Sequence, residues 1–191
     1  MNTLNPQTRI GELVAEDYRS AAVFKKHKID FCCNGGRSIA EACEKKNIDT
    51  QALINELNDA LKDASAEKID FNSWPADLLI DYILKKHHRY VEERIPILQE
   101  FLTKLVSVHG HHYKELLEIK AEFDEAAKAL GAHMKKEEII LFPYVQKMVL
   151  IQAAKTTLQP APFGTVENPI HMMHHEHDTE GERFRRIEKL S

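Results

Sequence analysis

Apolar residues recur every three or four positions along most of the chain, which is the period of one face of an α-helix. In the second half, one apolar seam runs from Leu84 to His109, a second from Leu116 to Tyr144, and a third stripe from Met173 to Phe184. Gly110 separates the first two seams, so we expect two helices joined as an antiparallel hairpin, followed by a third helix over about 170–190. The pattern predicts an all-α fold.

The chain is expected to form a small helical domain, a linker and a helical bundle, over residues 1–62, 63–75 and 76–191. In the first part, Ser38 is placed to cap a helix from Ile39 to Lys46, and Asp49 or Thr50 is placed to cap the next one. In the bundle, Pro143 is expected to mark a helix end, because proline lacks the N–H that an α-helix uses.

The composition excludes several classes of partner. The net charge is -4 with acidic and basic residues interspersed, so we expect no nucleic acid and no anionic membrane surface as a partner. No apolar run approaches the roughly 20 residues that cross a bilayer, and the first residues lack the pattern of a secretory signal. With an odd number of cysteines, three, the sequence predicts a cytoplasmic protein whose cysteines are free thiols.

Two polar residues interrupt the second apolar seam. His133 and Glu137 stand four residues apart, which places both side chains on the helix face that also carries Ile140 and Tyr144. An imidazole and a carboxylate therefore occupy positions where a packed helix would carry leucine. Buried groups of this kind are costly unless they are paired or bound to a metal.

The hairpin brings a second histidine to the same level. His88 lies 21 residues before His109, and His133 lies 21 residues after His112. At about 1.5 Å per residue, both are about 32 Å from the turn, each on the inner side of its helix. His177 lies on the inner stripe of the third helix, so three expected bundle helices each contribute one histidine.

Nitrogen and carboxylate donors on rigid helices suit iron or manganese, whereas a structural zinc site more often recruits thiolates. Helical bundles commonly hold two metals bridged by carboxylates, and Glu137 is the natural bridge. A lone core histidine is more often bonded to a backbone carbonyl, but three at one level beside a glutamate favour metal. The predicted metal ligands are His88, His133, Glu137 and His177.

The remaining polar motifs have simpler interpretations. His109 is interpreted as a turn residue. The run Lys135-Lys136-Glu138 is interpreted as solvated, as are His111, His112, His171, His174 and His175, although His174 lies three residues before His177 and is a spare ligand candidate. Cys32 and Cys33 precede a glycine turn, so they are either redox-active thiols or small apolar filler. Cys43, inside a helix, is interpreted as filler.

Two sets of motifs resemble the repair-of-iron-centres (RIC) family. The run Ile29-Asp-Phe-Cys-Cys-Asn-Gly-Gly resembles its short N-terminal domain, and the segments from His133 to Pro143 and from Glu176 to Glu182 resemble its hemerythrin-like domain. The likeness covers nearly the whole chain, with both domains in the family's order.

The resemblance implies a cytoplasmic stress-response protein with a non-haem di-iron centre, which helps to repair iron–sulfur clusters damaged by nitric oxide or peroxide. It implies His88, His133, Glu137 and His177 as iron ligands, with Glu137 bridging. The implied partners are damaged iron–sulfur proteins and the small ligands NO and O2. Iron donation and NO removal both remain open, the latter as an NO-reducing activity that would make the protein an enzyme.

One feature departs from the family pattern, which continues into a fourth helix with another His-x-x-x-Glu. The sequence stops at Ser191, 14 residues beyond His177. We therefore expect the sequence to be truncated relative to the native protein, with a helix donated by a second chain, as in a homodimer, as the alternative.

The sequence leaves two other functions open. The first is a hemerythrin-like carrier or sensor of O2 or NO without a repair role, against which the N-terminal cysteine domain weighs. The second is a metal-free helical interaction module whose core histidines are bonded within the protein.

Overall fold

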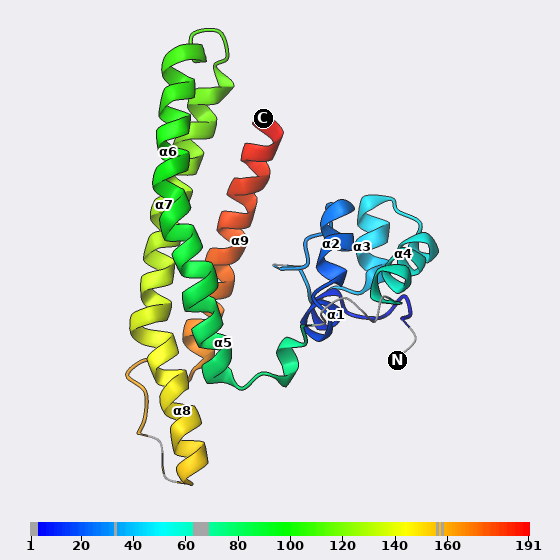
Figure 1. Ribbon diagram of the computed structural model, residues 1–191, viewed down its shortest axis with the longest axis vertical. Coiled ribbons are helices and arrows are strands. Elements are labelled where there is room, and N and C mark those ends of the chain that lie inside the picture. The colour runs from blue at the N-terminus through cyan, green and yellow to red at the C-terminus, as the bar shows by residue number, and fades with distance from the viewer. Residues whose placement is uncertain (1–3, 33, 63–68, 156, 158) are drawn as a thin grey trace. The chain divides into compact units, whose positions relative to one another are not determined.

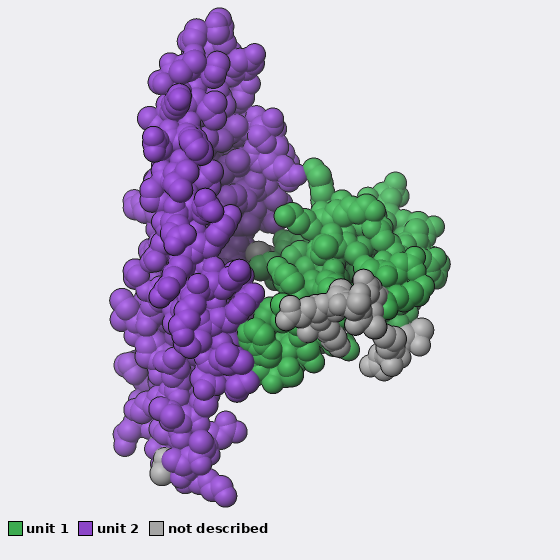
Figure 2. Space-filling view, in the orientation of Figure 1, with its two compact units in different colours: residues 1–74 green, residues 75–191 purple. Residues whose placement is uncertain are grey.

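The structure, a computed structural model, describes residues 4–32, 34–62, 69–155, 157 and 159–191. Its contacts divide the chain into two compact units, Met1–Trp74 and Pro75–Ser191, which Figure 2 shows in separate colours. All regular elements in the described ranges are helices, which confirms the all-α prediction. Within these ranges, no helix combines the length and the apolar character needed to cross a membrane.

The first unit packs short helices around one apolar core. They are α1 (Ile10–Glu16), α2 (Ser20–Lys26), α3 (Ile39–Lys46), α4 (Thr50–Lys62) and the 3-10 turn η1 (Phe71–Ser73). Its core includes the fully buried side chains of Ile10, Phe24, Ile39, Leu53 and Leu57. Of the expected linker, residues 63–68 lie outside the described ranges.

The predicted helix starts in this unit are confirmed. The Ser38 hydroxyl accepts the N–H of Glu41, and the Glu41 carboxylate accepts the N–H of Ser38, so both form a capping box at the start of α3. At the start of α4, the Asp49 carboxylate accepts the N–H of Ala52 at 2.8 Å. Both helices therefore begin where a side chain satisfies an otherwise unpaired backbone donor.

The second unit consists of three helical rods (Figure 1). The first joins α5 (Ala76–Tyr82), the π-helical turn η2 (Ile83–His88) and α6 (Arg89–His109); the second joins α7 (Glu115–Lys136), the π-helical turn η3 (Glu137–Leu141) and α8 (Phe142–Ala154); the third is α9 (Glu167–Leu190). The first two rods are antiparallel and joined by a tight turn after Gly110, which confirms the predicted hairpin. The third rod packs along α7.

Pro143 does not end a helix, so that prediction is wrong. It lies in the first turn of α8, which continues to Ala154. Proline is tolerated there because the first N–H groups of a helix have no partner within it, and the preceding π turn already changes the hydrogen-bond pattern.

The prediction of which side chains of the second rod point inward is also wrong beyond Glu137. Ile140 is 45% exposed, whereas Leu141 and Phe142 are 8% and 7% exposed. A π turn holds more residues than an α turn, so η3 rotates every later side chain relative to a regular helix. Leu141 and Phe142 thereby pack with Ile80 and Met173 in place of Ile140.

The seam of the first rod is only partly covered. In α6, all of which is described, no residue is fully buried, and Leu98 and Leu105 are 43% and 42% exposed. The reason is that α6 packs chiefly against α7, so one side of its apolar seam has a neighbour and the other faces solvent in this chain.

Substitution at adjacent positions tests the register set by η3. We expect Leu141→Ala to lower the free energy of unfolding of the bundle by about 2–4 kcal/mol, because it leaves a cavity in a buried cluster. The matched variant Ile140→Ala should change it by less than about 0.5 kcal/mol, since Ile140 is exposed. Hydrogen exchange of α7 and α9 amides measures both, and the reverse order would show a regular α-helical register.

Candidate metal centre

The candidate ligands gather where the three rods run side by side. His88 ends η2, His133 lies in the last turn of α7, Glu137 begins η3, and His177 lies near the middle of α9. His88 and His133 are each 6% exposed, whereas His177, which was expected on the inner stripe of its helix, is exposed to solvent although its ring contacts His133. Two of the four residues, His88 and Glu137, therefore lie in π-helical turns. Such turns within α-helices are frequent at functional sites.

Glu137 lies between two histidines from different rods. Its Oε2 is 3.0 Å from Nε2 of His88, and its Oε1 is 3.5 Å from Nε2 of His133. The contact with His88 confirms that the two halves of the hairpin bring these residues to one level. Each carboxylate oxygen thus faces a different imidazole, which is the arrangement that a bridging carboxylate needs.

His177 completes the cluster from the third rod. Its Nε2 is 3.0 Å from Nε2 of His133, and the two rings are tilted by 49° with centroids 4.7 Å apart. Two nitrogens that each lie about 2.1 Å from one ion, at a right angle to each other, are about 3 Å apart. The spacing of these nitrogens therefore fits two ligands of one metal ion.

The candidate ligand atoms contact one another in pairs. Across the described part of the chain, no three His, Cys, Asp or Glu side chains form a ready-made cage around one point. In the cluster, both ring nitrogens of His88 and His133 and Nε2 of His177 instead lie within hydrogen-bonding distance of a neighbouring side chain. The donor types and the spacing of the pairs fit metal, and the bound ion would replace these direct contacts.

Two further carboxylates contact the outer nitrogens of the same rings. Glu138 Oε1 is 3.0 Å from Nδ1 of His88, and Glu176 Oε2 is 2.8 Å from Nδ1 of His133. Lys135 donates to Glu138 at 2.6 Å, and Lys136 donates to Glu176.

The interpretation of Lys135-Lys136-Glu138 as a solvated face was therefore wrong for Glu138, whose side chain is 23% exposed. Sequence reasoning missed Glu138 and Glu176, although each adjoins a predicted ligand. Neighbouring residues on a helix point about 100° apart, so a residue next to an inward ligand can reach another rod. Adjacency to a predicted ligand was therefore the available signal, but it does not identify the ring that each carboxylate contacts.

The electrostatics of the cluster follow from this pairing. The hydrogen bond to Glu137 chiefly raises the pKa of His133, with help from Glu176, against the opposite effect of burial. Burial by itself would raise the pKa of Glu137, but the hydrogen bond and charge of His133 and the contact with His88 outweigh it and lower that pKa. Burial and the nearby His133 lower the pKa of His177. The cluster therefore stabilises one ionised carboxylate among imidazoles.

Apolar side chains form one wall of the site. The Phe142 ring stacks on His88 with centroids 5.8 Å apart and an angle of 28°. Phe142 belongs to the buried cluster that also contains Ile80, Leu141 and Met173. This wall excludes water from one side of His88 and strengthens the electrostatic interactions there.

The other late histidines lie outside the cluster. His174 is exposed, as are His87, His109, His111, His112, His171 and His175. The prediction that most of them are solvated is confirmed.

The cysteine loop belongs to the first unit. Cys32 is an exposed free thiol, Cys43 is fully buried, and Cys33 lies outside the described residues. Burial raises the pKa of Cys43, which supports its interpretation as filler. The loop is fixed where the N–H of Gly11 donates to the carbonyl of Gly35 at 2.7 Å, and a Cβ on Gly35 would lie only 2.5 Å from a backbone oxygen.

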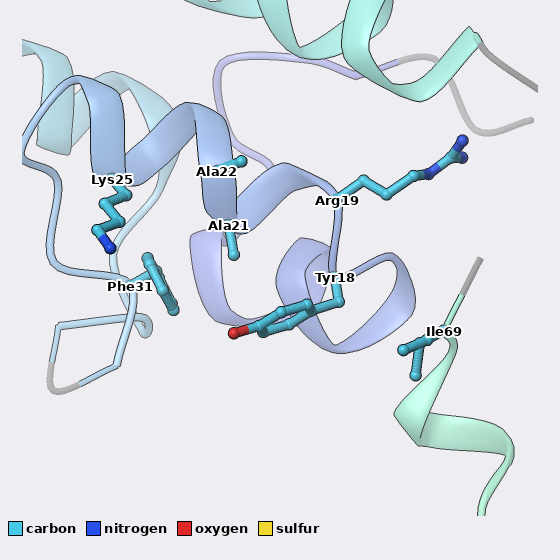
Figure 3. Close-up of a pocket in the computed structure, with 7 residues that line it drawn as sticks. All are labelled: Tyr18, Arg19, Ala21, Ala22, Lys25, Phe31 and Ile69. Carbon is cyan, nitrogen blue, oxygen red and sulfur yellow. The ribbon is translucent and has the colours of Figure 1, made fainter. Parts of the chain in front are cut away.

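A cavity of about 320 Å³ lies beside this loop. Figure 3 shows the Tyr18 hydroxyl and the Lys25 amine on the side of the cavity that Phe31 closes. Its lining residues are Tyr18, Arg19, Ala21, Ala22, Lys25, Phe31 and Ile69. Among the described residues, the lining contains no histidine, cysteine or carboxylate, so the bundle cluster is the better candidate for a metal.

Comparison with known proteins matches both units. Residues 6–61 match the ScdA_N model, a domain of unknown function, and residues 79–191 match the model of the hemerythrin HHE cation binding domain. Proteins named iron-sulfur cluster repair protein YtfE are similar, from Yersinia pestis (strain Pestoides F) and from Yersinia pseudotuberculosis serotype O:1b (strain IP 31758). Each is 30% identical over 182 residues, which covers 95% of this chain and 76% of the relative.

Proposed function

We propose, since the chain belongs to the repair-of-iron-centres family that joins an ScdA_N domain to a hemerythrin HHE domain, that it binds two iron ions and helps to repair damaged iron–sulfur clusters. The family relation supports iron binding and a repair role. The residues that hold the iron, and the number of ions, are proposed from the geometry of the bundle.

The position of Glu137 is the observation that carries the proposal. Its two oxygens lie 3.0 Å from Nε2 of His88 and 3.5 Å from Nε2 of His133, on opposite sides of one carboxylate. A structural ion pair needs only one of these contacts. A carboxylate with one imidazole at each oxygen matches a bridge between two ions.

Each residue would then have a defined role. His133 and His177 would hold one ion and His88 the other, and Glu137, which faces both His88 and His133, would be shared between the two. Bound iron supplies redox chemistry and coordination positions for small ligands such as NO or O2. The chain orients the imidazoles from three rigid rods and excludes water on the Phe142 side of His88.

Two routes to repair follow from such a site. In the first, iron is cargo that is handed to a damaged cluster; in the second, NO is bound and removed near the damaged protein. The N-terminal unit with Cys32 and Cys33 is the part that a simple carrier of O2 or NO does not need. The cytoplasmic location remains a prediction from the sequence.

Substitution of His177 and of Glu137 should distinguish the two ions. We expect His177→Ala to lose one bound ferrous ion and keep the other, because only the His133 side depends on it, whereas Glu137→Ala should weaken both. His175→Ala, an exposed position two residues earlier, should leave the iron content unchanged. Iron per chain, measured with a chromophoric chelator after anaerobic loading and desalting, tests this, and equal iron content in all three variants would contradict the assignment.

The repair role needs a separate assay. A cluster enzyme inactivated by NO should regain activity when mixed with the iron-loaded protein, and much less with metal-free protein or with the loaded Glu137→Ala variant. Full reactivation by metal-free protein would refute the proposal. Binding of O2 or NO without any reactivation would favour a carrier or sensor.

A further inference from the structure

The outer nitrogen of each central histidine makes the same kind of contact. His88 Nδ1 lies 3.0 Å from Glu138 and His133 Nδ1 lies 2.8 Å from Glu176, although the two pairs come from different elements. Each carboxylate also accepts a hydrogen bond from a lysine of α7: Glu138 from Lys135 and Glu176 from Lys136. The site therefore contains two chains of contacts in the order lysine, glutamate, histidine.

This order places a proton on Nδ1 of each ring. An ionised carboxylate only accepts hydrogen bonds, so Nδ1 of the imidazole must donate to Glu138 or Glu176. In both rings Nε2 faces Glu137, which is also a carboxylate, so the lone pair of Nε2 would become available only when a bound ion replaces that contact. Because Nδ1–H stays bonded to the outer carboxylate, Nε2 is then the nitrogen presented to the metal.

We propose that Glu138 and Glu176 are positioning residues, which hold His88 and His133 in the tautomer and orientation that present Nε2 to the metal. The inference rests on the proposed metal site and deepens it. Such outer carboxylates fix the ring of a ligating histidine and raise its basicity.

The two chains of contacts also join separate rods. Glu138 of η3 contacts His88 of η2, so this contact joins the second rod to the first. Glu176 of α9 contacts His133 and Lys136 of α7, so it joins the third rod to the second. Because Glu176 directly precedes His177, the same contacts set the height of His177 beside His133. The proposed effect therefore depends on where these two carboxylates lie, and not only on the negative charge that they add.

The lysines have a distinct part in this arrangement. Glu138 and Glu176 are 23% and 26% exposed in their side chains, so water could otherwise compete for their oxygens. The ammonium groups of Lys135 and Lys136 hold one oxygen of each carboxylate and leave the other directed at the ring. Sequence position alone does not reveal this, because both lysines also lie on the outer side of α7.

Binding of Co²⁺, a spectroscopic probe for the iron sites, tests the proposal in the full chain. We expect Glu138→Ala and Glu176→Ala to weaken Co²⁺ binding by about 10- to 100-fold, measured by competition with a chelator. Glu138→Gln and Glu176→Gln should lose less, because an amide oxygen still accepts from Nδ1–H. Glu180→Ala is the matched control, since Glu180 lies one turn after Glu176 on α9 and pairs with Arg183.

A second measurement reports the tautomer directly. In the Zn²⁺-loaded, ¹⁵N-labelled protein, the Nδ1–H signals of His88 and His133 should both be observed. Glu138→Ala should remove the first signal only, and Glu176→Ala the second only. A purely structural role would not move them one at a time.

The outcomes separate the two proposals. If the wild-type protein binds Co²⁺ but the alanine variants bind it equally and keep both Nδ1–H signals, the positioning role is overturned and the metal site stands. If the wild-type protein binds no Co²⁺, Zn²⁺ or Fe²⁺, the metal site itself is overturned. If an alanine variant fails to fold, the glutamine variants decide by the same two measurements.

Discussion

The largely covered carboxylate of Glu137, whose side chain is 15% exposed, is the constraint on which the bundle depends. A charged group with little access to water is stable only when its oxygens are paired, and here each oxygen meets an imidazole from a different rod. Satisfying both contacts requires the two antiparallel rods to stand at one fixed register. The hairpin, the π turns and the packing of α9 all serve that requirement.

Two local features adjust the helices to it. The π turns η2 and η3 lie at the same level of the hairpin: η2 ends at His88 and η3 begins at Glu137. Each turn directs these side chains inward and shifts the residues that follow from the register of a regular α-helix. The third rod is held by ion pairs further along, where Glu122 of α7 accepts from Arg183 and Arg186 of α9. His177 thus reaches His133 through a rod that is anchored beyond the site.

The sequence predicted the main features of the site because they depend on spacing. Equal counts on both sides of the turn place His88 and His133 together, and a four-residue interval adds Glu137. The burial of Ile140 was predicted wrongly because a π turn leaves no clear mark in the pattern of apolar residues. Glu138 and Glu176 were missed because a glutamate among other polar residues of a helix has the same appearance on a solvated face as beside a metal site. Their role depends on a neighbouring rod, which only the folded structure identifies.

The central claim is that Glu137 bridges two ions between the rods. An anaerobic titration of the full chain with Fe²⁺, followed by oxidation and Mössbauer spectroscopy, tests it most directly. The account predicts saturation at about two iron ions per chain and a spin-coupled diferric pair, as expected for ions that share a carboxylate. Saturation at one ion, or two ions without magnetic coupling, would contradict it.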